Sequence, residues 1–91
     1  MKPVLMISAR DNVATALEAL VAGRLIDVNG LTVTVREPIP SGHKVAVRTI
    51  PAGTVVIKYG SPIGTATAAI APGDHVHVHN VASARGRGDL R

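Results

Sequence analysis

The sequence has 91 residues, of which 46% are hydrophobic and 18% charged, a balance typical of one small folded domain and not of a disordered chain. It contains no cysteine, which excludes disulfides, thiolate metal sites and cysteine nucleophiles. The net charge of +4 is too small to indicate a nucleic-acid partner, and a single tyrosine cannot stack single-stranded bases. No apolar run approaches the roughly 20 residues of a membrane span, so we expect a cytoplasmic protein without membrane contact.

A short strand is expected over residues 3–8, and it is followed by the one helix that the sequence predicts. Asp11 or Asn12 is a suitable helix N-cap, and Gly23 is a suitable end. Four apolar residues between them have the spacing of one helical face: Val13, Ala16, Leu17 and Leu20.

After this segment the hydrophobic period changes to two. Residues 25–28 and 31–36 alternate between apolar and polar side chains, with Asn29-Gly30 between them. Both residues of such a turn must tolerate positive φ, which makes Asn-Gly the strongest short signal for a β-hairpin.

The pattern Ile-x-x-Gly-x-x-Val then occurs in residues 39–45, 50–56 and 70–76. Each copy has a Pro/Gly turn that leads into an expected strand, over residues 43–49, 54–59 and 74–81 respectively. The sequence therefore predicts a mainly β domain with one short helix over residues 1–82. Residues 83–91 contain two glycines and three arginines and are expected to be a flexible basic tail. Their Arg-Gly-Arg-Gly run is too short to indicate RNA binding.

Three of the four histidines alternate within five residues: His75, His77 and His79. In a strand they would share one face, spanning roughly 13 Å, with Val76 and Val78 packed on the other face. Two neighbours in this row are close enough to bind one metal ion, with His43 or Asp74 supplying a further ligand. Anion binding, general acid–base chemistry and a merely solvent-facing strand are the alternatives.

Two weaker motifs carry cationic side chains. Lys58-Tyr59 leads into a glycine-rich loop over residues 59–64, where the pair suits a carboxylate or a hydroxyl group, although a solvated strand edge has the same composition. His43 and Lys44 follow a tight turn, which makes them either a prepositioned cationic pair or an ordinary polar turn.

Together these segments resemble a known family. Residues 40–48, 56–67 and 75–80, preceded by 11–17, follow in order the pattern of the N-terminal domain of the altronate/galactarate dehydratases. The resemblance covers about residues 5–82. It implies a SAF-like β-clip fold, which is also found in sialic-acid synthases and antifreeze-like proteins.

The resemblance also implies a function. Family members are hydro-lyases that remove water from sugar acids with a divalent metal, iron or manganese. This chain is similar to a separate small subunit that is inactive alone and shares an active site with a large catalytic subunit. The small subunit is also expected to be able to form a homo-oligomer. The alternatives are the small subunit of a sulfolactate sulfo-lyase and a non-catalytic SAF-type ligand-binding or assembly module.

The site residues implied by this reading fall into three overlapping groups. His75, His77 and His79 are expected to hold the metal, and the last two also to act in catalysis. The substrate-binding group is expected to contain His43, Lys58, Tyr59 and Asn80.

Overall fold

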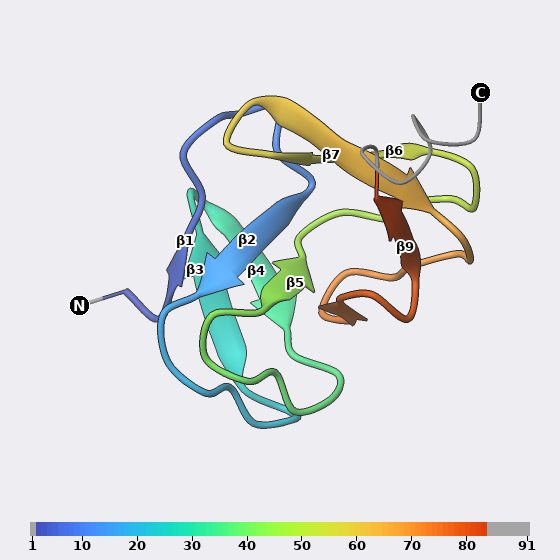
Figure 1. Cartoon of the computed structure of the whole chain (residues 1–91). Helices are drawn as coiled ribbons and strands as arrows, with labels where there is room; N and C mark the ends of the chain where they lie inside the picture. Colours follow the sequence, from blue (N-terminus) through green and yellow to red (C-terminus); the bar gives the residue numbers. More distant parts are fainter. Residues whose placement is uncertain (1, 84–91) are drawn as a thin grey trace.

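The computed structural model describes residues 2–83, so the expected basic tail lies outside the described residues except for Ser83 (Figure 1). Short strands make up the regular structure of this part. In chain order they are β1 (Val4–Leu5), β2 (Val13–Ala16), β3 (Leu25–Val28), β4 (Leu31–Thr34), β5 (Lys44–Ala46), β6 (Val55–Lys58), β7 (Ser61–Ala66), β8 (His75–Val76) and β9 (Val81–Ser83).

These strands form three antiparallel sheets. The largest has the order β1-β2-β5-β8, the hairpin β3-β4 is a second, and β6-β7-β9 is the third. In Figure 1, β2 lies across the β3–β4 hairpin, and β6 and β9 lie beyond β5 on the other side. The four-stranded sheet is therefore the central layer.

An aliphatic core lies on each side of this central sheet. Alternate residues of β2 enter different cores: Val13 packs with Val56 and Val76, whereas Ala14 packs with Ile26. β5 divides its side chains in the same way, with Val45 in one core and Ala46 in the other. A strand buried on both faces has no polar alternation, which explains the sequence of β2.

The predicted helix is wrong, because residues 13–16 form strand β2. Val13, Ala14 and Ala16 are buried in that strand, whereas Leu17, assigned to the apolar helical face, is 49% exposed. No helix occurs among residues 2–83, and in this part of the chain there is accordingly no long apolar helix able to cross a membrane.

Asp11 and Asn12, the expected helix caps, bind distant backbone groups of the β6–β7 hairpin, and Asp11 also binds the nearby Ser8 N–H. The Asp11 carboxylate accepts hydrogen bonds from the N–H groups of Ser8 at 3.3 Å and Gly60 at 2.7 Å. The Asn12 side chain donates to the Val55 carbonyl and accepts from the Ile57 N–H, at 3.0 and 2.8 Å. These contacts attach the central sheet to the β6–β7 hairpin.

The repeated pattern is the main organising feature of the fold. Gly42, Gly53 and Gly73 all have φ between 84° and 91°, as the turn interpretation requires. The structure adds a fourth copy over residues 20–26, in which Gly23 has a φ of 90° and is a turn glycine, not a helix end. The copies pair through reciprocal backbone bonds, Leu20 with Ile39 and Ile50 with Ile70.

The hairpin prediction is confirmed, with positive φ at both Asn29 (52°) and Gly30 (89°). β3 and β4 pair in register from Leu25 opposite Thr34 to Val28 opposite Leu31. The strands that follow the repeat turns are shorter than expected: β5 has three residues, β6 has four and β8 has two.

Acid should weaken the Asp11 contact. Burial raises the pKa of the Asp11 carboxyl, but backbone hydrogen bonds from Gly60, Ser8, Tyr59 and Ile7 lower it below its ordinary value of 3.8. A lowered pKa in the folded state stabilises the fold above pH 3.8, and this contribution is lost as the pH falls further. At pH 7 we expect Asp11→Ala to reduce the free energy of unfolding by about 2–4 kcal/mol, since buried N–H groups lose their acceptor.

Urea denaturation at pH 7 and pH 3 measures the free energy of unfolding of both proteins. The difference in this free energy between wild type and Asp11→Ala should be smaller at pH 3 than at pH 7. The matched control is Asp27→Ala, which removes an exposed carboxylate that accepts from the Gly30 N–H and should cost less than about 1 kcal/mol. Equal losses for the two variants would contradict the proposed role of Asp11.

Candidate functional site

Three histidines converge at one edge of the central sheet, where the paired strands β5 and β8 lie. His43 directly precedes β5, and His75 begins β8, where it pairs with Val45. The ring of His77 stacks on that of His43 with centroids 4.0 Å apart, and the His43 and His75 centroids are 5.0 Å apart. One ligand nitrogen from each histidine lies within 4.8 Å of the other two.

The nitrogens of this cluster, His43, His75 and His77, are incompletely hydrogen-bonded. His43 Nδ1 lies 2.8 Å from His75 Nε2, so one of these two nitrogens is a deprotonated acceptor. His77 Nδ1 is buried without a hydrogen-bond partner in the structure. A buried unpartnered ring nitrogen is costly unless a ligand satisfies it.

Burial and mutual repulsion favour the neutral form of the His75 and His77 rings. The pKa of His75 is lowered, first by burial and then by the charges of the other histidines, against an opposing effect of Glu37. Burial also lowers the pKa of His77, with further contributions from His43, Lys44 and His79. At neutral pH both imidazoles therefore keep lone pairs for ligand binding.

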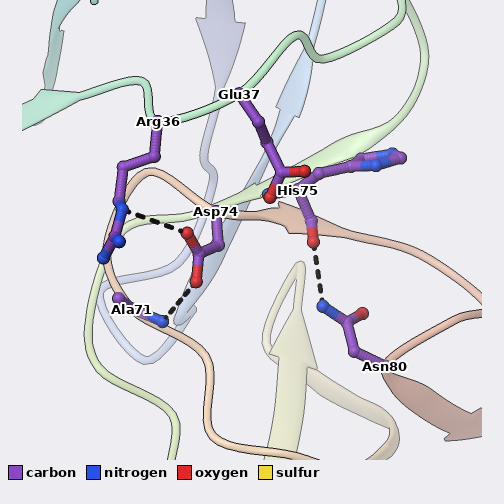
Figure 2. A network of polar contacts seen from close by, with 6 residues as sticks. All are labelled: Arg36, Glu37, Ala71, Asp74, His75 and Asn80. Carbon is purple, nitrogen blue, oxygen red and sulfur yellow. Dashed lines mark hydrogen bonds and ion pairs between the residues drawn. The ribbon is translucent and has the colours of Figure 1, made fainter. Parts of the chain in front are cut away.

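The histidine row does not lie on one continuous strand as expected. β8 ends at Val76 and residues 77–80 form a turn, so that Val78 is 82% exposed instead of packed. Asn80 closes the turn: its Oδ1 accepts from the His77 N–H at 3.0 Å. Its Nδ2 donates to the His75 carbonyl at 2.9 Å (Figure 2). Through the backbone, Asn80 positions two histidines of the cluster.

His79 and Asp74 lie outside the cluster. The exposed His79 ring is tilted by 38° to the His75 ring, with centroids 5.2 Å apart. The Asp74 carboxylate pairs with Arg36 at 3.4 Å and accepts from the Ala71 N–H at 2.8 Å (Figure 2). Of the two candidates for a further metal ligand, the structure therefore brings His43 to the row and leaves Asp74 engaged elsewhere.

A hollow of about 320 Å³ adjoins the cluster and spans the boundary between two sheets. Lys44 enters it from β5 and Lys58 from β6. Its remaining lining is Ile63, His77, Val78, Val81 and Ser83. Lys44 was not among the predicted site residues; its place beside His43 in the cationic turn was the available signal.

Tyr59 is not part of this lining. Its hydroxyl lies 3.1 Å from Thr15 Oγ1, and Lys58 Nζ lies 4.9 Å from its ring centroid. The backbone of Tyr59 has a φ of 55°, in the tight turn whose next N–H binds Asp11. These contacts give Tyr59 a role in holding the turn that presents Lys58.

The fold and site define a small all-strand domain with a histidine cluster beside a lysine-lined hollow. The model of the altronate/galactarate dehydratase SAF domain matches residues 2–84, and the chain belongs to this family. The expectation of a mainly β, SAF-like fold is thereby confirmed.

Curated relatives fall into two groups. Altronate dehydratase of Escherichia coli (strain K12) is 53% identical over 74 residues, which are 81% of this chain and 15% of that protein. Altronate dehydratase of Bacillus subtilis (strain 168) is 39% identical over 80 residues, 88% of this chain and 16% of that protein. The (2R)-sulfolactate sulfo-lyase subunit alpha of Paracoccus pantotrophus is 41% identical over 59 residues, 65% of this chain and 88% of the subunit. The chain thus spans about a sixth of the altronate dehydratases and most of the sulfo-lyase subunit.

Proposed function

We propose that this chain is the small subunit of a sugar-acid hydro-lyase and contributes its histidine cluster and hollow to an active site shared with a large subunit. Membership of the dehydratase SAF-domain family supports the reaction class. The Paracoccus pantotrophus relative, named as a subunit, supports a separately encoded domain of this kind. The observation that carries the proposal is the convergence of His43, His75 and His77.

A divalent metal, iron or manganese, fits this cluster. Three imidazoles offer nitrogen donors to such an ion, and the buried Nδ1 of His77 has no other partner among residues 2–83. One ligand nitrogen of each histidine lies within 4.8 Å of the other two, so the three rings would hold one ion together. His43 thus replaces His79 in the predicted ligand set. Such an ion would supply Lewis acidity toward the departing hydroxyl and the enolate-like charge.

The predicted site residues outside the metal cluster bind the substrate, donate a proton or position other groups during the dehydration. A base contributed by the large subunit takes the C2 proton of a 2,3-dihydroxy acid, the C3 hydroxyl accepts a proton and leaves as water, and the resulting enol rearranges to the 2-oxo acid. Lys58 holds the carboxylate and stabilises the negative charge that develops on it. His79, exposed beside the cluster, gives the proton to the leaving hydroxyl. Asn80 and Tyr59 position the histidine turn and Lys58.

The test is a substrate assay of the chain purified together with its large subunit and supplied with Mn²⁺ or Fe²⁺. We expect altronate or galactarate to yield a 2-oxo acid, and His77→Ala to reduce kcat by about 100-fold or more while the complex still assembles. A Lys2→Gln complex is the control and should retain full activity. A complex inactive on every acid offered would contradict the proposal and favour the non-catalytic SAF module.

The sulfo-lyase reading is a second candidate, because the aligned region makes up 88% of the Paracoccus pantotrophus subunit. A sulfo-lyase reaction begins with the same removal of the α-proton but expels sulfite in place of water. Adding (2R)-sulfolactate to the same assay distinguishes the two, since sulfite release without water loss from altronate or galactarate would favour this candidate.

A further inference from the structure

Two lysines from different sheets share the hollow beside His77. Lys44 lies on β5 of the central sheet and Lys58 at the end of β6. Three of the other lining residues, Ile63, Val78 and Val81, are apolar. Charges against such walls interact more strongly than they do in open water.

The two ammonium groups have no carboxylate partner in the described part of the chain. The ion pairs among residues 2–83 join Arg24 to Glu18 and Arg36 to Asp74, and neither lysine takes part in them. Two like charges in one half-enclosed hollow disfavour each other unless an anion lies between them.

We propose that Lys44 and Lys58 form an oxyanion subsite that binds the carboxylate of a polyhydroxy acid at the edge of the histidine cluster. This inference rests on the proposed function and deepens it: His43, expected to hold the anionic end, lies within the cluster, and Lys44 takes that task. Ammonium groups bind carboxylates as compact point charges with several donors each. His77 lines the hollow and belongs to the cluster, so an acid held here extends its hydroxyl-bearing carbons toward the histidines.

The subsite is tested by NMR titration of the ¹⁵N-labelled chain with galactarate, in buffer containing a chelator. Galactitol, the neutral polyol with the same number of carbons, is the matched ligand. We expect galactarate to shift the amide signals of residues around the hollow and galactitol to leave them unchanged. Lys44→Met and Lys58→Met should each weaken galactarate binding by about tenfold or more, because each removes a charge-assisted contact.

Two further variants keep this result interpretable. Lys44→Arg retains the charge and should bind galactarate within about threefold of wild type, whereas Lys2→Met removes an exposed lysine that does not line the hollow and should change nothing. Equal binding of galactitol, no binding of galactarate, or unchanged affinity in both Lys→Met variants would overturn the inference. Because the titration is metal-free, a failure of the histidine cluster to bind metal would overturn the metal assignment alone.

Discussion

Replacing His77 with alanine should lower the affinity of the chain for Mn²⁺ by about 100-fold or more. The His77 ring contributes one of three nitrogens that lie within 4.8 Å of one another, and its Nδ1 is buried with no other partner in the described part of the chain. Residues that merely orient a metal ligand already contribute about 10–100-fold, so a direct ligand should contribute at least as much. His43→Ala and His75→Ala should have effects of the same size. Electron paramagnetic resonance of free aqueous Mn²⁺ at equilibrium measures the affinity.

His79→Ala provides the matched control for these variants. His79 belongs to the same turn but is exposed and lies outside the cluster, so its removal should change Mn²⁺ affinity by less than about threefold. Circular dichroism should give the same spectrum for all four variants. A His77→Ala chain that binds Mn²⁺ as wild type does, or an equal loss in His79→Ala, would contradict the ligand assignment.

Replacing Gly73 with alanine should reduce the free energy of unfolding by about 3 kcal/mol or more. Gly73 has a φ of 91°, and an added Cβ would overlap the carbonyl oxygen of Thr34. The left-handed backbone costs about 1–2 kcal/mol for alanine, and overpacking against a backbone atom adds about 1–3 kcal/mol. Relief by movement would break the bonds that Gly73 makes with Ala46 and Arg36, at 2.8 and 2.9 Å.

Gly42→Ala isolates the conformational part of this effect. Gly42 occupies the same place in its copy of the repeat, with a φ of 86°, but nothing lies within 4 Å of an added Cβ. We expect a loss of about 1–2 kcal/mol, measured by urea denaturation beside Gly73→Ala. If the two variants lose equal stability, the close approach at Thr34 contributes nothing.

The parts of the fold that were predictable from sequence are those set by local turn chemistry. Asn29-Gly30 predicted the hairpin because few other residue pairs accept positive φ at both positions. Gly42, Gly53 and Gly73 predicted their turns for the same reason. The copy containing Gly23 was missed because its flanking residues are Leu20 and Ile26 in place of isoleucine and valine, and because the glycine suited a helix end.

The helix prediction is wrong for a reason that the local sequence does not show. Val13, Ala14 and Ala16 are buried on both faces of a central strand, so the apolar residues show no period of two. Their spacing then fits a helical face by coincidence. Asp11 and Asn12 look like caps, but their partners Gly60 and Ile57 lie more than 40 residues away in the chain.

The site was predictable in composition but not in arrangement. The alternation of His75 and His77 indicated a shared face, and the turn before His43 indicated a prepositioned side chain. Only the antiparallel pairing of β5 with β8 brings His43 against them. Lys44 and Lys58 line the same hollow because it lies between two separate sheets. The spacing of the two lysines along the chain does not predict this.

The most direct test of the histidine cluster is anomalous X-ray diffraction from crystals of the chain grown with Mn²⁺, recorded on both sides of the manganese absorption edge. We predict one strong anomalous peak about 2.1–2.3 Å from a ring nitrogen of each of His43, His75 and His77. An anomalous map with no peak at the cluster, or with its peak at His79 instead, would contradict the central claim that these three histidines form a metal site.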